Sequence, residues 1–253
     1  MKHVAIIGAG IGGLAAAMRL AHGGVKVTVL EGQATPGGKM RSLPSAPGMI
    51  DAGPTVLTMK PVFEVLFRDV GCQLADYATL TQEDILARHF WRDGTRLDLM
   101  RDPQASLENV RHSFGAAAAA EFHRFSRDAQ HLFEQLNDPM MQAATPALWR
   151  MIPVILKSPG TFMRMDPLRS LAQSLAHRFS DPRLAQLFAR YATYIGGLPQ
   201  ASPALLALIW HVESLGVWHV KGGMRQLAFG MEACAQNLGA EFHYESFVTK
   251  FER

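Results

Sequence analysis

Four glycines near the N-terminus follow an apolar segment and are spaced to bind phosphate. Directly after residues 3–7, which read as a buried strand, come Gly8, Gly10, Gly12 and Gly13. The first would make a tight turn, the second would let a pyrophosphate approach the backbone, and the last would let the next helix pack closely on the strand. Glu31 ends a second apolar segment, where its carboxylate can accept hydrogen bonds from a ribose. The spacing predicts a dinucleotide-binding βαβ unit rather than an ordinary glycine-rich turn.

A second glycine cluster follows Glu31, at the point where an NAD enzyme would continue with regular alternation of strands and helices. It reads Pro36-Gly37-Gly38-Lys39-Met40-Arg41-Ser42. Two adjacent glycines beside two cationic side chains form a second surface for anions. Taken alone, the glycine pair could equally be a flexible loop. Together with the first motif, it favours a second contact with the same nucleotide.

The composition is that of a globular protein from a reducing compartment. The chain has 253 residues, 48% of them apolar, and a formal net charge of +3. This is enough apolar material for one large domain or two small ones. Cys72 and Cys234 lie far apart in the sequence without a CxxC spacing or a nearby histidine, so neither a disulfide framework nor a metal site is predicted. The N-terminus shows no signal-peptide pattern, and we expect a cytoplasmic protein.

Basic residues are concentrated between positions 139 and 190, where seven of them accompany two acidic residues. The stretch has no zinc-finger or helix-turn-helix pattern, so nucleic acid is not the expected partner. Its neutral residues suit a lipid interface, although they could equally form a Met-rich domain core. It is too short and too charged to span a bilayer, so we expect peripheral attachment to the cytoplasmic face of the inner membrane. The residues of this expected interface are Met140, Met141, Leu148, Trp149, Met151, Ile152, Val154, Ile155, Leu156, Phe162, Met163 and Met165, with Arg150, Lys157 and Arg164 among them.

Local signals predict strands, one hairpin and several helices along the rest of the chain. Asp93-Gly94 is expected to turn a β-hairpin over 87–99. Asp102-Pro103 is expected to start a helix with an apolar repeat through Leu136. Periodicity and glycine stops predict further helices over 14–22, 182–194, 204–215 and 223–238, and strands over 25–30 and 240–245.

The combined arrangement resembles the N-terminal signature of flavoproteins that bind FAD across a discontinuous domain, which include amine oxidases and carotenoid desaturases. Two further segments, 51–58 and 179–197, are similar to those of bacterial phytoene-type desaturases. Within that family the chain most resembles the hydroxyneurosporene and methoxyneurosporene desaturases of purple bacteria. The residues that carry this finer likeness are Arg88-His89-Phe90-Trp91, Leu208-Ile209-Trp210 and Gly216-Val217-Trp218.

The resemblance implies an α/β fold with a Rossmann-like, discontinuous FAD-binding domain and an inserted, mainly helical domain that carries the β-hairpin. The implied boundaries are 1–60 and 220–253 for the FAD-binding segments and 61–219 for the substrate and membrane-facing domain. The chain stops at Arg253 with apolar residues still present, and it lacks the family's C-terminal glycine-rich segment that contacts the flavin. We therefore expect the N-terminal part of a longer protein, and leave open whether this part is active alone.

The resemblance also assigns the cofactor contacts. The glycine loop and Glu31 would hold the ADP part of FAD, and the second glycine cluster would lie along the pyrophosphate toward the flavin. Val248 would be delivered toward the adenine by a late strand, although it could as well be an ordinary core valine. No metal ligand is expected. The expected FAD-binding residues are Gly8, Gly10, Gly12, Gly13, Glu31, Gly37, Gly38, Lys39, Arg41, Gly53, Pro54, Thr55 and Val248.

The implied activity is desaturation of an acyclic carotenoid in carotenoid biosynthesis, with the flavin accepting a hydride while the neighbouring carbon loses a proton. Such a substrate has almost no polar groups that a protein could bind, so we expect a long apolar cleft and name no catalytic side chain. The alternatives are a phytoene desaturase, a flavin amine oxidase, or a non-catalytic FAD-binding fragment.

Six side chains are candidates for a role near the substrate. The aromatic ones could line the cleft or simply pack between helices, and they are Tyr191, Tyr194, Trp210 and Trp218. His89 and Asp93 could be proposed as acid or base, but their positions in a hairpin favour a structural role.

Overall fold

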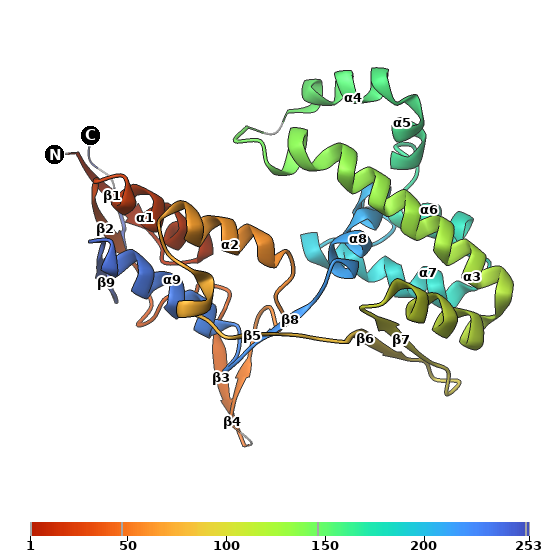
Figure 1. The fold of residues 1–253 in the computed structure, drawn as a ribbon, viewed down its shortest axis with the longest axis horizontal. Coiled ribbons are helices and arrows are strands. Elements are labelled where there is room, and N and C mark those ends of the chain that lie inside the picture. The colour runs from red at the N-terminus through yellow and green to blue at the C-terminus, as the bar shows by residue number, and fades with distance from the viewer. Residues whose placement is uncertain (1, 47, 146, 251, 253) are drawn as a thin grey trace. The chain divides into compact units, whose positions relative to one another are not determined.

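The computed structural model describes residues 2–46, 48–145, 147–250 and 252, with Leu148 described by its backbone alone. The chain forms two compact units. Unit 1 combines residues 1–83 with 217–253, and unit 2 is the continuous stretch 84–216. Figure 1 follows the chain from unit 1 into unit 2 and back. The sequence-based boundaries were 60/61 and 219/220, so unit 1 includes more of the chain than the expected FAD-binding segments.

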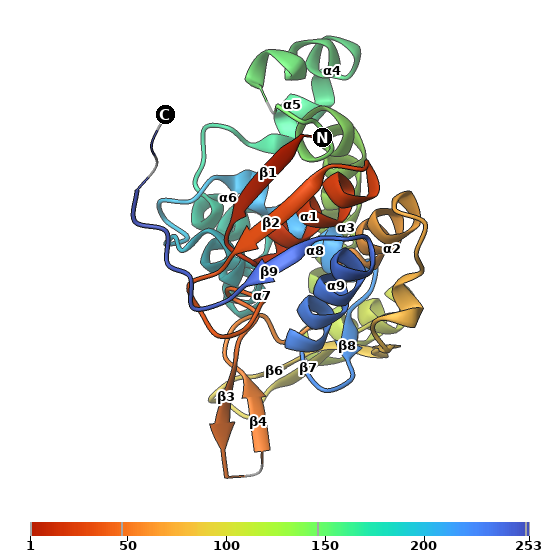
Figure 2. The same ribbon diagram turned by 90° about the vertical axis from the view of Figure 1, so that its left-hand side faces the viewer.

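Unit 1 contains a three-stranded parallel sheet with the order β1-β2-β9. Its strands are β1 (His3–Ile7), β2 (Lys26–Leu30) and β9 (Glu241–His243). Helices α1 (Ile11–His22) and α9 (Arg225–Asn237) pack against each other beside this sheet, as Figure 2 shows. A strand from the end of the chain therefore completes a sheet that the first thirty residues begin, which is a discontinuous Rossmann-like α/β arrangement.

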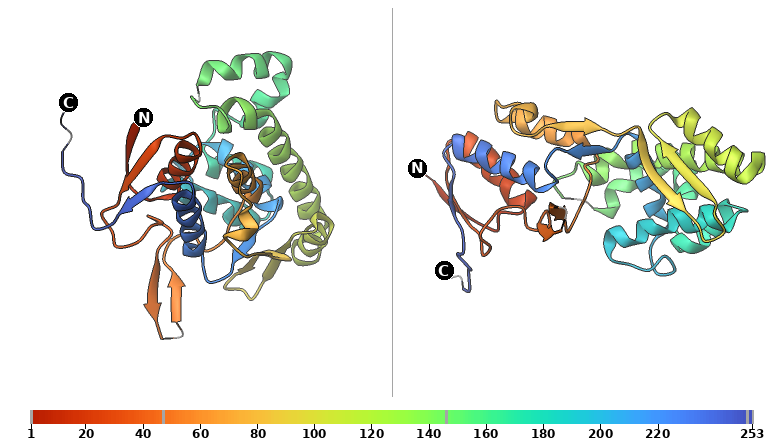
Figure 3. Two further views of the ribbon diagram at one scale, coloured as in Figure 1. Left: turned by 60° about the vertical axis from the view of Figure 1, so that its left-hand side comes forward. Right: turned by 90° about the horizontal axis from the view of Figure 1, so that it is seen from below.

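The remaining elements of unit 1 lie between these segments. Their bounds are β3 (Ser42–Ser45), β4 (Gly48–Asp51), α2 (Lys60–Asp69), the 3₁₀ helix η1 (Leu74–Asp76), β5 (Leu80–Gln82) and β8 (Trp218–Val220). The β3–β4 hairpin extends away from the sheet (Figure 3). Strands β5 and β8 pair antiparallel where the chain leaves unit 1 and returns to it. Apolar residues of α1, α2 and α9 share one core with β2.

Unit 2 is mainly helical and carries one β-hairpin. Its elements are β6 (Ile85–Phe90), β7 (Arg96–Met100), α3 (Pro103–Leu136), the π-helical turn η2 (Asn137–Met141), the 3₁₀ helix η3 (Leu148–Met151), α4 (Ile152–Lys157), α5 (Pro159–Met165), α6 (Leu171–Arg178), α7 (Pro182–Ala189), the 3₁₀ helices η4 (Arg190–Ile195) and η5 (Ala204–Leu208), and α8 (Ile209–Ser214). Phe125 and Phe188 lie at the centre of its separate core, with ring centroids 4.6 Å apart.

Most of the predicted elements are confirmed. The strands over 3–7 and 25–30 match β1 and β2, the hairpin over 87–99 matches β6–β7, and Asp102 caps α3 by accepting a hydrogen bond from the Gln104 N–H at 2.9 Å. The helix predicted from Leu14 begins earlier, at Ile11, because the last glycines of the loop already have helical geometry.

Two predicted helices in unit 2 are only partly correct. The one expected over 182–194 ends as α-helix at Ala189 and continues as the 3₁₀ helix η4, which Gly196 ends in a left-handed conformation. The one expected over 204–215 begins as the 3₁₀ helix η5. Ser202 does not cap it, since its hydroxyl donates to the Leu198 carbonyl at 2.8 Å and Pro203 takes the cap position.

Candidate FAD-binding site

The glycine loop joins β1 to α1 in unit 1. Gly8 has a φ of +92°, which other L residues rarely adopt, and its N–H donates to the Leu30 carbonyl at 2.8 Å. Gly10 takes the N-cap position of α1, and none of the side chains that the structure describes caps this helix. The N–H groups of the first turn and the positive end of the helix dipole are therefore available to an anion.

The glycines of this loop lack side chains for two different reasons. A Cβ at Gly13 would lie 2.0 Å from the Gly8 carbonyl oxygen, so the close packing of α1 on β1 requires glycine there. A Cβ at Gly10 or Gly12 would meet no protein atom within 4 Å. The fold does not need glycine for space at Gly10, and the open space beside its backbone fits a bound phosphate.

Glu31 reaches back from the end of β2 to the glycine loop. Its Oε2 accepts a hydrogen bond from the Ala9 N–H at 2.7 Å, and its Oε1 accepts one from the Gln33 N–H at 2.9 Å. Each carboxylate oxygen keeps a further lone pair for a ligand hydroxyl. The acid predicted to bind ribose thus lies next to the loop predicted to bind phosphate, and it also orients that loop.

The second glycine cluster packs directly on the first. The Gly37 N–H donates to the Ala9 carbonyl at 2.9 Å, and a Cβ at Gly38 would lie 3.3 Å from the Gly10 Cα. Both Gly37 and Gly38 have positive φ angles, of +118° and +56°. The structure therefore brings together two motifs that are separated by more than twenty residues in the sequence.

Two cations and a third segment lie beside this cluster. Lys39 and Arg41 are exposed, and within the residues that the structure describes neither side chain has a hydrogen-bond or ion-pair partner. Gly53 packs so closely on the Lys39 carbonyl oxygen that a Cβ would lie 1.9 Å from it. Pro54 and Thr55 follow on the surface. The segment after β4 is thereby held against the second cluster, with its last residues open to a ligand.

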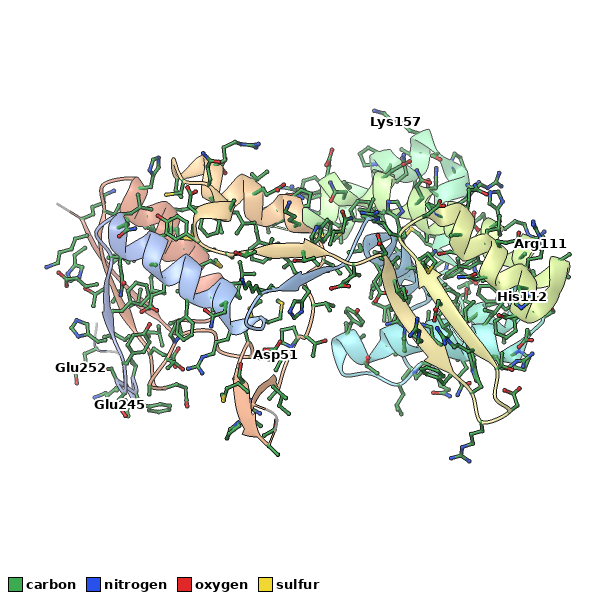
Figure 4. The ribbon with its side chains drawn as sticks, turned by 60° about the horizontal axis from the view of Figure 1, so that its bottom comes forward. Asp51, Arg111, His112, Lys157, Glu245 and Glu252 are labelled. Atoms are coloured by element: carbon green, nitrogen blue, oxygen red, sulfur yellow. The ribbon has the colours of Figure 1, made fainter. Side chains whose placement is uncertain are left out.

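Asp51 has a role that the sequence reasoning missed. Its two carboxylate oxygens lie 3.2 and 3.1 Å from the Met224 N–H, at the N-terminus of α9 (Figure 4). A Cβ at Gly223 would lie 2.8 Å from the same carboxylate. The available signal was the start of α9, where a Gly-Gly-Met sequence offers no capping side chain of its own.

Val248 follows β9 rather than lying in it, and it is half-buried. Two residues earlier, the Ser246 N–H donates to the Glu31 carbonyl at 2.8 Å, and the Glu245 N–H donates to the Gln33 carbonyl at 3.1 Å. The residues directly before Val248 therefore lie beside Glu31, the acid expected to bind the ribose.

The aromatic candidates for a substrate cleft fall into both units. Trp218 belongs to β8 of unit 1, whereas the other three belong to unit 2. The hydroxyls of Tyr191 and Tyr194 donate to the Glu213 carboxylate at 3.0 and 2.8 Å. Burial, followed by the charge of Glu213, raises the pKa of both phenols, that of Tyr194 to about 12. These two hydroxyls are occupied within a polar network that also contains Arg190.

His89 and Asp93 have the structural surroundings that their hairpin positions suggested. Asp93 accepts a hydrogen bond from the Thr95 N–H at 2.9 Å within the turn and forms an ion pair with Arg183. Burial, and then the charge of Arg190, lowers the pKa of His89 to about 4. The imidazole is therefore neutral at physiological pH.

The two cysteines meet in unit 1, although they are remote in sequence. Their Sγ atoms lie 3.3 Å apart as free thiols, with Cys72 in the segment after α2 and Cys234 in the last turn of α9. Among the described residues, no group of three or more His, Cys, Asp or Glu side chains has an arrangement that could hold a metal ion.

Comparison with known proteins reveals close relatives along the whole chain. The chain is 44% identical over 99% of its length to the hydroxyneurosporene desaturase of Cereibacter sphaeroides, covering 50% of that protein. It is 34% identical over 99% of its length to the all-trans-zeta-carotene desaturase of Myxococcus xanthus, covering 47% of it. The chain thus spans about half the length of the curated relatives that it matches.

The fold is also found in solved structures. A putrescine oxidase structure matches 96% of this chain and 51% of its own with a TM-score of 0.62, at 19% sequence identity. This likeness supports the Rossmann-like architecture. Residues 11–253 match the protein family described as flavin containing amine oxidoreductase. The match covers nearly the entire chain and agrees with the FAD cofactor that the resemblance to flavoproteins implied, and the chain belongs to this flavin-dependent family.

Proposed function

We propose that the full-length protein is an FAD-dependent desaturase of an acyclic carotenoid of the hydroxyneurosporene or methoxyneurosporene type. The observation that carries the proposal is the 44% identity to hydroxyneurosporene desaturases over 99% of this chain. The geometry of unit 1 supports it, because the glycine loop, Glu31 and the second glycine cluster converge on one site.

The residues present fit the ADP and pyrophosphate parts of FAD. The open space beside Gly10 and Gly12 and the uncapped first turn of α1 suit the phosphates. Glu31 has lone pairs for the ribose hydroxyls, and Lys39 and Arg41 offer positive charge near Gly37 and Gly38. We further assign Gly8, Gly13, Gly53, Pro54, Thr55 and Val248 to this site, as the residues that shape or border it.

A bound flavin would supply the oxidation by taking a hydride from a substrate carbon while the neighbouring carbon loses a proton. This chain's part is to hold the cofactor and to orient a hydrocarbon chain in an apolar environment. We propose that unit 1 is the FAD-binding part and that unit 2 provides the substrate and membrane-facing surfaces. We assign no acid or base role to His89 or Asp93, since turn geometry and burial account for both.

We also propose that unit 2 attaches peripherally to a membrane. No helix within the described residues is long and apolar enough to cross a bilayer. Large apolar side chains are nevertheless exposed between 149 and 168, among them Trp149, Leu156, Met163 and Leu168, which are 67, 75, 75 and 95% exposed. Lys157 lies exposed among them, so the surface combines apolar anchors with a cation that suits anionic lipid. Met151, which was also expected on this surface, is buried at 5% exposure, and the side chain of Leu148 lies outside the described residues.

The membrane proposal is tested by flotation of the full-length protein with anionic vesicles. The wild-type protein should float with the vesicles, and a Leu156→Ser, Met163→Ser, Leu168→Ser variant should stay in the soluble fraction. The matched control carries serine at Leu43 and Met49, which are exposed on the β3–β4 hairpin of unit 1. A wild-type protein that does not float, or a triple variant that floats equally, would disprove the assignment of this surface.

The cofactor proposal is tested by FAD titration of the purified full-length protein. Gly10→Val should block the pyrophosphate position, and Glu31→Ala should weaken FAD binding by about 1.5–3 kcal/mol, the range for a hydrogen bond to a charged group.

A second experiment separates the proposed desaturase from a phytoene desaturase and a flavin amine oxidase. It measures the turnover of acyclic carotenoids, phytoene and amines by the change in absorption. Conversion of an amine but of no carotenoid would reject the desaturase proposal, and a full-length protein that takes up no FAD would reject the cofactor assignment.

A further inference from the structure

A cavity of about 300 Å³ lies within unit 2, between α8 and two separate stretches of α3. Gly115, with a φ of +92°, interrupts the helical geometry of α3 between these stretches. The residues that line the cavity come from the end of β7 and the residue after it, from the two stretches of α3, and from α8 and the residue after it: Met100, Arg101, Pro103, Gln104, Ser106, Leu107, Phe122, His123, Ser126, Arg127, Gln130, Trp210, His211, Ser214 and Leu215. A cavity of this volume takes one end of a long hydrocarbon rather than its whole length.

The walls of the cavity are largely apolar. Leu107, Phe122 and Trp210 contribute to them, and the rings of Phe122 and Trp210 lie 5.5 Å apart between centroids. Both rings are only 3% exposed, so their positions are fixed by the core of unit 2. These surfaces suit a branched aliphatic or polyene chain.

Ser126 places a neutral hydrogen-bond donor at the wall, beside the buried ring of Trp210. The Trp210 Nε1–H donates to Ser126 Oγ at 2.8 Å, which fixes the hydroxyl beside the indole. The hydroxyl's own proton has no acceptor among the residues described by the structure. His211 also borders the cavity, and burial lowers its pKa, so it adds no charge at neutral pH.

Two arginines also belong to the lining of the cavity. Arg101 forms an ion pair with Asp84, and Arg127 is exposed to solvent. A neutral donor beside two buried rings is better matched by an uncharged oxygen than by a carboxylate or phosphate, whose burial there would be costly. The complementary ligand is an apolar chain that ends in a hydroxyl or an ether.

We propose that this cavity receives the oxygen-bearing end of the carotenoid and that Ser126 donates a hydrogen bond to its oxygen. The inference rests on the proposed function and adds a specificity-determining site to it. A hydroxyl and a methyl ether both present an acceptor oxygen, so the same donor serves either end group. A hydrocarbon end packs against the same walls but leaves the Ser126 hydroxyl unpaired, which lowers the affinity for the hydrocarbon.

The test compares two polyenes that differ only in a tertiary hydroxyl at one end, with the FAD-loaded full-length protein. Affinity is measured by quenching of tryptophan fluorescence, and kcat/KM by the change in polyene absorption. Ser126→Ala should weaken binding of the hydroxylated polyene about tenfold and leave the hydrocarbon unchanged. Ser126→Thr, which keeps the hydroxyl, should restore the preference.

Ser113→Ala is the matched control, because Ser113 is on the same helix but donates to the Arg96 carbonyl outside this cavity. It should leave both affinities unchanged. Equal effects of Ser126→Ala on the two polyenes, or no effect on either, would overturn the inference. If the wild-type protein binds the polyenes but converts neither, the desaturase proposal fails. The affinities for the two polyenes still show whether Ser126 distinguishes a hydroxylated end from a hydrocarbon end.

Discussion

The carboxylate of Asp51 accepts a hydrogen bond from the backbone N–H of Met224, which lies 173 positions later in the chain. This contact ties the end of the β3–β4 hairpin to the start of α9. The helix that brings the chain back to the sheet is thus capped by a residue of the first segment. This helix packs on α1, which begins in the glycine loop. The first segment of unit 1 therefore stabilises the N-terminus of a helix that belongs to the second segment.

Asp51→Ala should destabilise unit 1 by about 1 kcal/mol, the usual cost of losing a helix cap. Asp51→Asn retains one acceptor oxygen and should lose less. The measurement is urea unfolding followed by circular dichroism. Asp76→Ala, an exposed acid of the same unit, is the control and should not shift the midpoint. Equal midpoints for Asp51→Ala and wild type would show that the cap contributes nothing.

Gly13→Ala should damage the fold itself, because the added Cβ would lie 2.0 Å from the Gly8 carbonyl oxygen. We expect a loss of about 3 kcal/mol or more, since the backbone must move. Gly12→Ala adds the same atom in open space one residue earlier and should leave stability unchanged or raise it slightly. Thermal unfolding without FAD compares the two variants, and similar melting temperatures would contradict the steric argument.

His89 makes the stability of unit 2 depend on pH. Its pKa is about 4 in the folded protein, chiefly because of burial, and near 6.5 when unfolded. Between these values the unfolded chain binds more protons, so the contribution of His89 is fully present above pH 6.5 and is lost as the pH falls toward 4. Asp98, Arg190 and Glu213 are the charged groups that act on it.

Urea unfolding of wild type and His89→Gln at pH 7 and pH 5 measures this dependence. The drop in stability between the two values should be smaller in the variant. His112→Gln removes an exposed histidine from α3 of the same unit and serves as the control. A variant with the full wild-type drop would rule out His89 as its source.

Cys72 and Cys234 should differ in reactivity although their sulfur atoms lie 3.3 Å apart. Cys234 is fully buried, and burial raises its pKa to about 12, so almost no thiolate forms at neutral pH. N-ethylmaleimide should label the half-buried Cys72 in the native protein and both residues after unfolding, as measured by peptide mass spectrometry. In Cys72→Ser, native labelling should disappear. Labelling of Cys234 before Cys72 would contradict the expected order.

The local elements could be predicted from the sequence wherever a short-range signal determines them. The turn at Gly8, the Asp93-Gly94 turn and the Asp102 cap each act within a few residues, and the structure has all three. The contact between Glu31 and Ala9 spans 22 positions, but the spacing of the dinucleotide motif predicts that the acid lies beside the loop. The type of helix at an end is different: α-helix gives way to 3₁₀ helix after Ala189, and no local pattern in the sequence indicates this change.

Several long-range contacts that no motif marks were missed by the sequence reasoning. Nothing near Asp51 indicates Met224 as its partner, and the distance between Cys72 and Cys234 in the sequence hides the contact between their thiols. Ser126 reads as one more polar residue of a long helix until Trp210 is found beside it. Each of these contacts depends on how distant segments pack, which periodicity alone does not determine.

The antiparallel pairing of β5 with β8 has a consequence for how the chain reaches this fold. The Glu83 N–H donates to the Val217 carbonyl at 2.9 Å, so the two ends of the segment that forms unit 2 are held side by side. An unfolded segment of this length would make closure of unit 1 costly in chain entropy. If unit 2 folds first and its ends approach each other, it shortens the effective loop between β2 and β9. The inserted unit would then act as an internal folding aid for the sheet that the cofactor needs.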